Sequence, residues 1–238
     1  GNPASEDCDL KFIELEGVSF SHKNGNGFRL EVPNLAFRKG EKVILFGASG
    51  SGKSTLFDLM CGFQFSDIGE VRYNSEVIDN RNVFSYYPKI GFVPQRLFML
   101  ADTVFQNITL GLVDVGQDDP SLLRMIKLVG LDKALNLDPI DVLRLEVNDE
   151  GSSLSGGQVQ RLGIARGLFN EPDFLFLDET ISGLDKKSSR EILENIFSEY
   201  RNSTIIVISH SNFRSDNFDT IINLDDLKSK SKPLICTI

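Results

Sequence analysis

Residues 47–55, GASGSGKST, combine glycines, a lysine and hydroxyl side chains in a spacing that suits the binding of phosphate groups. Gly50 and Gly52 let backbone amides converge on an anion, and the helix expected after them directs its positive end to the same point. Lys53 supplies a positive charge for the β and γ phosphates, and the hydroxyl of Ser54 suits Mg²⁺. A flexible glycine loop is the alternative, but the full pattern between a strand and a helix favours a nucleoside triphosphate site. The residues expected to contact the nucleotide are Gly47, Ala48, Ser49, Gly50, Ser51, Gly52, Lys53, Ser54 and Thr55.

Two adjacent carboxylates end the apolar run at residues 174–179, FLFLDE. The four apolar residues predict a buried strand, and Asp178 then emerges at its carboxyl end, where α/β sheets bind ligands. Asp178 is expected to hold Mg²⁺ through water, and Glu179 is placed to polarise a water aimed at the γ-phosphate as a general base. The alternative is that the two carboxylates cap a helix that follows the strand. The phosphate site predicted at residues 47–55 favours the catalytic role.

A second glycine-rich stretch, LSGGQ at residues 154–158, precedes a long helical pattern. Ser155, Gly156 and Gly157 would present exposed amides and a hydroxyl at the start of that helix, without a lysine. These groups could cap an anion but include no metal site of their own. A plain helix N-cap explains the serine but does not need two glycines followed by Gln158. The stretch therefore predicts contact with a phosphate that another site holds.

Apolar strands and helices alternate through most of the chain. Short runs between residues 11 and 46 predict three strands, and the third leads directly into the glycine loop. The alternation after that loop predicts a parallel sheet with helices on both faces. A helical stretch from about 97 to 165 interrupts it and is expected to form an inserted subdomain. The other elements expected are a helix closed by Gly62, strands at 70–74, 89–93, 173–179, 204–210 and 219–224, and helices at 157–169 and 186–200.

Composition narrows the class of protein. The 238 residues are 41% hydrophobic and 25% charged, as in an ordinary globular domain. The net charge of -9 would repel nucleic acid, so we do not expect nucleic acid as a direct partner. No apolar run approaches the ~18 residues of a membrane span. The three cysteines, Cys8, Cys61 and Cys236, lack metal-binding spacing and favour a reducing compartment, with Cys61 in the core. Residues 1–10 are interpreted as a tag remnant or linker, and 11–238 as one domain.

The motifs GASGSGKST, LSGGQ and FLFLDE, in that order, resemble those of the ATP-binding-cassette (ABC) ATPases over about residues 11–224. Many NTPases share the first and third motifs, whereas LSGGQ is specific to this family. The resemblance implies an α/β P-loop NTPase fold with a parallel core sheet, an N-terminal antiparallel β-subdomain and an inserted α-helical subdomain. It also implies ATP and Mg²⁺ as ligands, and ATP hydrolysis as the activity.

The resemblance assigns roles to further residues. In this family two cassettes pair head to tail. The signature motif of one cassette, which is LSGGQ at residues 154–158 in this sequence, caps the γ-phosphate held by the other. Gln95, in FVPQ, occupies the position of a Mg²⁺ and water ligand that reports nucleotide state to a membrane partner, and His210, in VISH, that of a catalytic γ-phosphate contact. The residues that the resemblance places on the partner's ATP are Ser155, Gly156, Gly157, Gln158 and Asp185.

One position departs from the family pattern. ABC ATPases commonly stack adenine on an aromatic residue at the place where this chain has His22, in GVSFSH. An imidazole can stack on a base with less area, so His22 is expected to contact the nucleotide, with a plain surface loop as the alternative. The preference for ATP over GTP stays open.

Two segments resemble exporters within the family. Residues 97–111, after Gln95, resemble the segment that touches the membrane domains, and residues 143–158 resemble the exporter segment before the signature. We therefore expect a cassette of an exporter at the cytoplasmic face of a membrane, with transmembrane domains on the same full-length chain. An importer ATPase or a non-transport ABC ATPase is the alternative, and both an identical and a different partner cassette stay open. The matching residues are Thr103, Asn107, Ile108, Gly111, Glu146, Val147 and Gly151.

Overall fold

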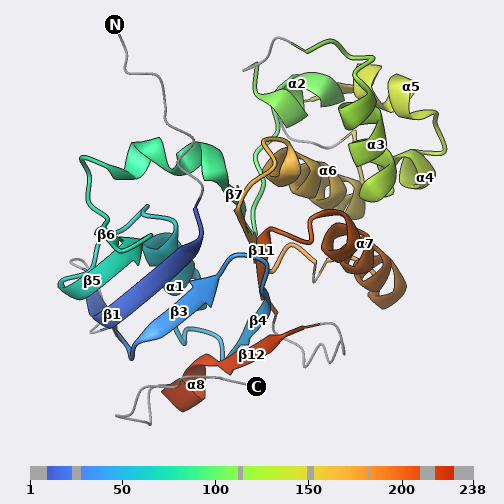
Figure 1. The fold of residues 1–238 in the computed structure, drawn as a ribbon. Coiled ribbons are helices and arrows are strands. Elements are labelled where there is room, and N and C mark those ends of the chain that lie inside the picture. The colour runs from blue at the N-terminus through green and yellow to red at the C-terminus, as the bar shows by residue number, and fades with distance from the viewer. Residues whose placement is uncertain are drawn as a thin grey trace, which may run out of the picture.

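Two sheets and two groups of helices make up the described part of the chain, residues 10–22, 28–111, 115–148, 153–181, 183–209 and 218–227 of the computed structural model (Figure 1). The central strand of the antiparallel sheet pairs with three of the others. Its strands are β1 (Phe12–Ser21), β2 (Arg29–Val32), β3 (Leu35–Arg38), β5 (Ile68–Tyr73) and β6 (Glu76–Val77).

The prediction of three strands between residues 11 and 46 was wrong by one. The apolar run at 28–37 divides into β2 and β3, which pair with different parts of β1. Pro33 lies between them and has no amide hydrogen to donate to a neighbouring strand, so the run is interrupted there.

The second sheet is parallel, in the order β12-β4-β11-β10-β7. Its register aligns the carboxyl ends of all five strands along one edge. The expected parallel core sheet is thus confirmed, and the loops after β4, β7 and β10 leave it on the same side. The strands are β4 (Lys42–Phe46), β7 (Ile90–Val93), β10 (Phe174–Asp178), β11 (Thr204–Ile208) and β12 (Thr220–Asn223).

Successive side chains of β10 enter two different cores. Phe174 and Phe176 pack with α1 (Lys53–Met60) and the antiparallel sheet, whereas Leu175 and Leu177 pack with α6 (Gly156–Leu168) and α7 (Lys186–Glu199). Figure 1 shows α1 on one side of the parallel sheet and α6 and α7 on the other. A strand that is buried on both faces in this way reads as a continuous apolar run, as FLFL does.

The stretch between β7 and α6 is mainly helical, as expected. Gly130 has a left-handed φ of 66° and separates α3 (Pro120–Leu128) from α4 (Leu131–Leu135). The sequence did not predict the short antiparallel pair β8–β9, which joins the two ends of this stretch. Its elements are β8 (Asp102–Thr103), α2 (Val104–Thr109), α3 (Pro120–Leu128), α4 (Leu131–Leu135), α5 (Pro139–Arg144) and β9 (Glu146–Val147).

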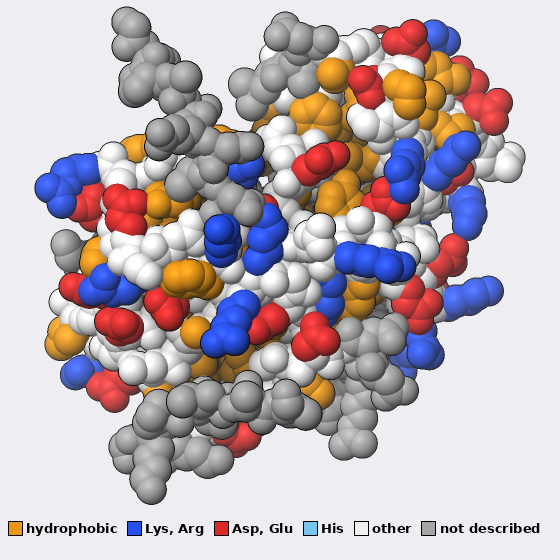
Figure 2. Space-filling model, in the orientation of Figure 1, with side chains coloured by type: hydrophobic (Ala, Val, Ile, Leu, Met, Phe, Trp, Pro, Cys, Tyr) orange, Lys and Arg blue, Asp and Glu red, His pale blue; other side chains and the backbone are white. Residues whose placement is uncertain are grey.

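Three short elements complete the described chain: the 3₁₀ helices η1 (Val83–Ser85) and η2 (Tyr87–Lys89), and helix α8 (Leu224–Leu227) after β12. Cys61 is buried in the core beside α1, as predicted. Among the described helices, none has the length and apolar character needed to cross a bilayer. Figure 2 shows acidic and basic side chains interleaved over the face in view.

A pair of glycines offers a test of the antiparallel sheet. Both have left-handed φ angles, +76° at Gly69 and +57° at Gly17. A Cβ on Gly69 would lie 2.3 Å from the carbonyl oxygen of Glu16 and 2.4 Å from that of Gly17, whereas a Cβ on Gly17 would meet nothing within 4 Å. We expect Gly69→Ala to lower the free energy of unfolding by about 3 kcal/mol, because backbone atoms cannot move aside as a flexible side chain can.

The matched control is Gly17→Ala, which carries only the backbone strain of about 1 kcal/mol. Urea denaturation of the two variants beside the wild type measures the difference. Equal midpoints for both variants would show that β1 and β5 approach less closely than described.

Candidate active site

The loop between β4 and α1 has the shape that its glycines predict. Gly50 has a φ of 76° and Gly52 a φ of 98°, conformations that favour glycine and turn successive amides toward the start of α1. Lys53 is 5% exposed, and its ammonium donates hydrogen bonds to the carbonyl oxygens of Gly47 (2.9 Å) and Ala48 (3.0 Å). The ammonium is therefore held at the loop, where it can exchange a carbonyl partner for a phosphate oxygen.

Asp178 lies beside this loop although it is far away in the sequence. Its side chain is 6% exposed and is hydrogen-bonded to Ser54, but its Oδ1 atom is buried and has no hydrogen-bond partner among the described residues. Burial raises the pKa of the Asp178 carboxyl; the hydrogen bond from Ser54 opposes this shift, and the nearby Glu179 carboxylate adds to it. A buried carboxylate with an unsatisfied oxygen is costly unless a cation or a donor reaches it.

The oxygens of Ser54 and Asp178 fit Mg²⁺, a hard cation that binds through one or two carboxylates, water and substrate phosphates. Within the described ranges, no group of three or more His, Cys, Asp and Glu side chains could hold a metal.

Glu179 and Gln95 meet at the same edge of the sheet. Gln95 Nε2 donates a hydrogen bond of 2.5 Å to Glu179 Oε2, which joins the ends of β7 and β10. Glu179 has a left-handed φ of 52°, and the buried Thr180 hydroxyl donates to the Val93 carbonyl (3.0 Å), which fixes the turn. The two residues that the sequence placed in one site are thus in direct contact, which sequence spacing could not reveal.

His22 lies in a small aromatic group near the phosphate loop. Its exposed ring is 5.0 Å from that of Phe20 and 5.3 Å from that of Phe28, measured between ring centroids. Phe28 in turn reaches the loop, because a Cβ on Gly52 would lie 3.0 Å from its ring. No pattern in the sequence pointed to Phe28 as a site residue. The pairing of Ser21 with Arg29 brings it opposite His22, but the strand register was not known.

The signature serine is the N-cap of α6. Its hydroxyl accepts a hydrogen bond from the amide of Gln158, and the Ser155 amide donates one to the side-chain oxygen of Gln158, which completes a capping box. The Gln158 side-chain nitrogen also donates to the Ala134 carbonyl of α4 (2.9 Å). Gly156 is exposed, and a Cβ there would meet nothing within 4 Å. The N-cap interpretation is therefore correct, and it leaves the first turn open to solvent.

The signature and the phosphate loop belong to different parts of the fold. The helix α6 packs in one core and α1 in the other, on opposite sides of the parallel sheet (Figure 1). Asp185 is the exposed N-cap of α7, and its carboxylate accepts from the amides of Lys187 (3.1 Å) and Ser188 (3.0 Å). Hydrogen bonds from Ser188 lower the pKa of Asp185. His210 and Gly151 lie outside the described residues.

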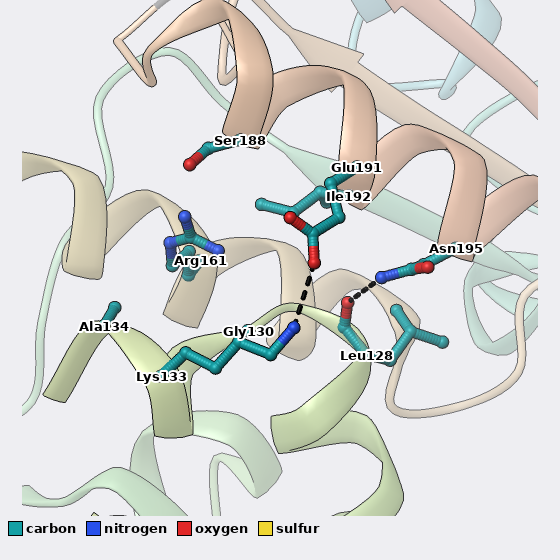
Figure 3. Close-up of a pocket in the computed structure, with 9 residues that line it drawn as sticks. All are labelled: Leu128, Gly130, Lys133, Ala134, Arg161, Ser188, Glu191, Ile192 and Asn195. Atoms are coloured by element: carbon teal, nitrogen blue, oxygen red, sulfur yellow. Dashed lines mark hydrogen bonds and ion pairs between the residues drawn. The ribbon is translucent and has the colours of Figure 1, made fainter. Parts of the chain in front are cut away.

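A polar cavity of about 230 Å³ opens between α4, α6 and α7, away from the phosphate loop (Figure 3). Lys133 and Glu191 form an ion pair across it at 3.0 Å, and Arg161 donates to the Val129 carbonyl beside it (2.6 Å). The ion pair connects α4 to α7, whose N-cap is Asp185, and the Arg161 bond connects α6 to the end of α3. The cavity therefore marks the junction of these helices.

Comparison with known proteins identifies the family. A family model described as ABC transporter matches residues 30–182. The chain belongs to the ABC transporter family. A solved chain of a bacterial Atm1-family ABC exporter with ATP bound superposes with a TM-score of 0.81 and 27% identity, and the match covers 94% of this chain and 38% of that one. The fold is accordingly that of an ABC ATPase.

Curated relatives of this cassette include bacterial and human proteins. The glutathione/L-cysteine transport system ATP-binding/permease protein CydC of Haemophilus influenzae is 31% identical over 91% of this chain. The ATP-dependent lipid A-core flippase of Neisseria meningitidis is 31% identical over 91%, and ATP-binding cassette sub-family B member 6 of Homo sapiens 33% identical over 90%. The chain spans 37%, 34% and 24% of the lengths of these three relatives, respectively. The cassette is thus similar to those of proteins that include an ABC exporter and a lipid flippase.

The unsatisfied carboxylate of Asp178 leads to a prediction about stability. We expect Asp178→Asn to raise the free energy of unfolding of the ligand-free domain at neutral pH by about 1 kcal/mol or more, because a neutral amide is cheaper to bury. The pKa of Asp178 is raised in the folded chain above the ordinary 3.8, so the unfolded chain releases this proton first as the pH rises. As the pH rises from 3.8 to the raised pKa, the folded wild type loses stability because the buried carboxyl becomes charged. When the pH is lowered through the same window, the carboxyl becomes neutral and the advantage of Asp178→Asn should shrink.

Thermal denaturation at several pH values measures this effect. Asp185→Asn is the matched control, because the ionised form of that exposed N-cap is favoured by folding and its removal should bring no gain. A lower melting temperature for Asp178→Asn at neutral pH would contradict the described burial.

Proposed function

We propose that this cassette binds and hydrolyses ATP at a site it shares with a second cassette, and thereby powers export by membrane domains. The observation that carries the proposal is the convergence of Lys53, the Ser54–Asp178 pair and the Gln95–Glu179 pair at one edge of the parallel sheet. These are the parts that an ATPase needs: a phosphate cradle, oxygen ligands for a metal and a base for water.

The phosphate loop supplies the binding of the nucleotide. In the proposed complex, amides of residues 49–55 surround the β-phosphate, and the Lys53 ammonium exchanges its carbonyl partners for phosphate oxygens. The rings of His22 and Phe28 are in contact near Gly52 of the loop, and they would offer the base a stacking surface. Ser54, Asp178 and Gln95 would hold Mg²⁺, which neutralises charge on the phosphate oxygens when bound.

Glu179 is proposed as the general base. As the oxygen of a water forms a bond to the γ-phosphorus, Glu179 accepts a proton from that water, and the bond between the γ-phosphorus and the bridging oxygen breaks to release ADP. Gln95 donates a hydrogen bond to the Oε2 atom of Glu179. In the proposed mechanism, the carboxylate also accepts a hydrogen bond from the attacking water. Lys53 and His210 stabilise the charge that develops on the γ-phosphoryl oxygens.

The signature is proposed to act on the ATP of a partner cassette. Ser155, Gly156 and Gly157 offer a hydroxyl and the amides of an open helix start, without a basic side chain, which suits an anion held elsewhere. Gln158 and Asp185 would lie in the same interface. Because these contacts to the γ-phosphate form only when two cassettes close, ATP favours the closed dimer and its hydrolysis favours opening.

The surface near α2 is the proposed contact with the membrane domains. Phe98 is 62% exposed, and Leu100 and Leu110 are also exposed large apolar residues. Arg166 of α6 donates to the carbonyls of Phe98 (3.0 Å) and Asn107 (2.7 Å), so this segment is tied to the signature helix. We propose that the segment transmits the state of the nucleotide site to the membrane domains. The helical stretch from about 97 to 165 would then act as a subdomain. The whole protein would work at the cytoplasmic face of a membrane.

Substitution of Glu179 tests the proposed chemistry. We expect Glu179→Gln to reduce the rate of ATP hydrolysis about a hundredfold or more, because an amide cannot accept the proton from water. Binding of ATP, measured by calorimetry, should persist because the phosphate loop is untouched. Glu171→Gln, at the opposite end of β10, is the matched control and should hydrolyse ATP at the wild-type rate. Hydrolysis by Glu179→Gln at the rate of this control would exclude Glu179 as the base.

A further inference from the structure

The contact between helix α8 and the phosphate loop has no role in the function proposed so far. Strands β12 and β4 run in parallel, with Ile222 beside Leu45 and Asn223 beside Phe46. Both strands therefore leave the sheet at the same level, and the residues that follow them come side by side. There the Ala48 amide donates a hydrogen bond of 2.8 Å to Asp225 Oδ2.

Helix α8 is seated against the loop. A Cβ on Gly47 would lie 3.3 Å from the Leu224 Cβ, 3.5 Å from Asp225 Oδ2 and 2.9 Å from the buried Ser51 hydroxyl. Leu224 is buried, and the Asp225 amide donates to the Asn223 side chain (3.1 Å). The Asp225 carboxylate is thus presented by an anchored turn, although it is exposed to solvent.

Ala48 occupies a central position in the loop. Its carbonyl accepts hydrogen bonds from the Lys53 ammonium (3.0 Å) and from the Ser51 amide (3.1 Å), while its amide is held by Asp225. Asp225 therefore fixes one side of the residue whose other side holds the phosphate-binding lysine. Without that anchor, the entry to the loop would gain freedom that ATP binding must remove at a cost in free energy.

We infer that Asp225 is a positioning residue for the phosphate loop, acting on bound ATP through Ala48. The inference rests on the proposed function, because ATP is the ligand that the loop would bind. A carboxylate near bound phosphates is electrostatically unfavourable, so the negative charge of Asp225 does not favour ATP. The useful property of Asp225 is therefore its hydrogen-bond acceptor. Asparagine offers the same acceptor without the charge, so Asp225→Asn and Asp225→Ala separate the two properties.

The test measures the dissociation constant of ATP with Mg²⁺ for the wild type and these variants. Asp225→Ala is expected to raise the dissociation constant about tenfold, the effect of losing one hydrogen bond that orders the loop. Asp225→Asn should bind ATP at least as tightly as wild type, and Asp226→Asn, which removes the neighbouring charge, should leave the affinity unchanged. The melting temperature without nucleotide should be the same for all, which distinguishes positioning from a general loss of stability.

Hydrogen exchange of the Ala48 amide gives a second measurement that needs no variant. In the wild type this amide should exchange slowly, and more slowly still with ATP bound. Fast exchange in the wild type, or an Asp225→Ala variant with wild-type affinity, would overturn the inference and leave the proposed function intact. A wild-type domain that binds no ATP would overturn the proposed function itself, and this inference with it.

Discussion

The parallel pairing of β4, β11, β10 and β7 is the constraint on which the rest of the structure depends. Because all of these strands run in one direction, the phosphate loop, Gln95 and the Asp178–Glu179 pair emerge at a single edge, although the intervening chain is long. The burial of β10 on both faces fixes its register, since a slip by one residue would exchange the phenylalanines and leucines between the two cores. The placement of Asp178 is thus a consequence of packing as well as of hydrogen bonding.

The polar groups of the site are largely paired within the chain. Lys53 bonds to carbonyls of its own loop, Glu179 is held by Gln95, and Ser155 forms a capping box with Gln158. In the proposed function, ATP and the partner cassette would exchange these internal contacts for contacts with phosphate. The net affinity is then a difference between two sets of hydrogen bonds. Asp178 differs from the other groups, because its Oδ1 atom has no partner among the described residues and a bound cation would satisfy it.

Much of this arrangement could be predicted from the sequence. The strand before GASGSGKST and the apolar run before Asp178 have strong local patterns, so their elements and their common sheet edge were expected. The helix starts at Ser155 and Asp185 were also accessible, because their capping chemistry is local.

The features that were missed depend on pairing between distant segments. The β8–β9 pair has two residues in each strand and no periodicity, and Phe28 reaches His22 only through the register of β1 and β2. The contact of Asp225 with Ala48 likewise follows from the position of β12 beside β4. No spacing within one segment indicates such contacts, because they arise from the assembled sheet.

The central claim is that LSGGQ acts on the ATP of another cassette. The most direct test is the solution mass of the Glu179→Gln variant with and without ATP and Mg²⁺, measured by light scattering. A shared site predicts a doubling of the mass with ATP, and the loss of this doubling when Ser155→Arg is added, because an arginine would fill the open helix start that caps the partner's phosphate. A Glu179→Gln variant that binds ATP and keeps its monomer mass at every protein concentration would contradict a site shared between two copies of this chain.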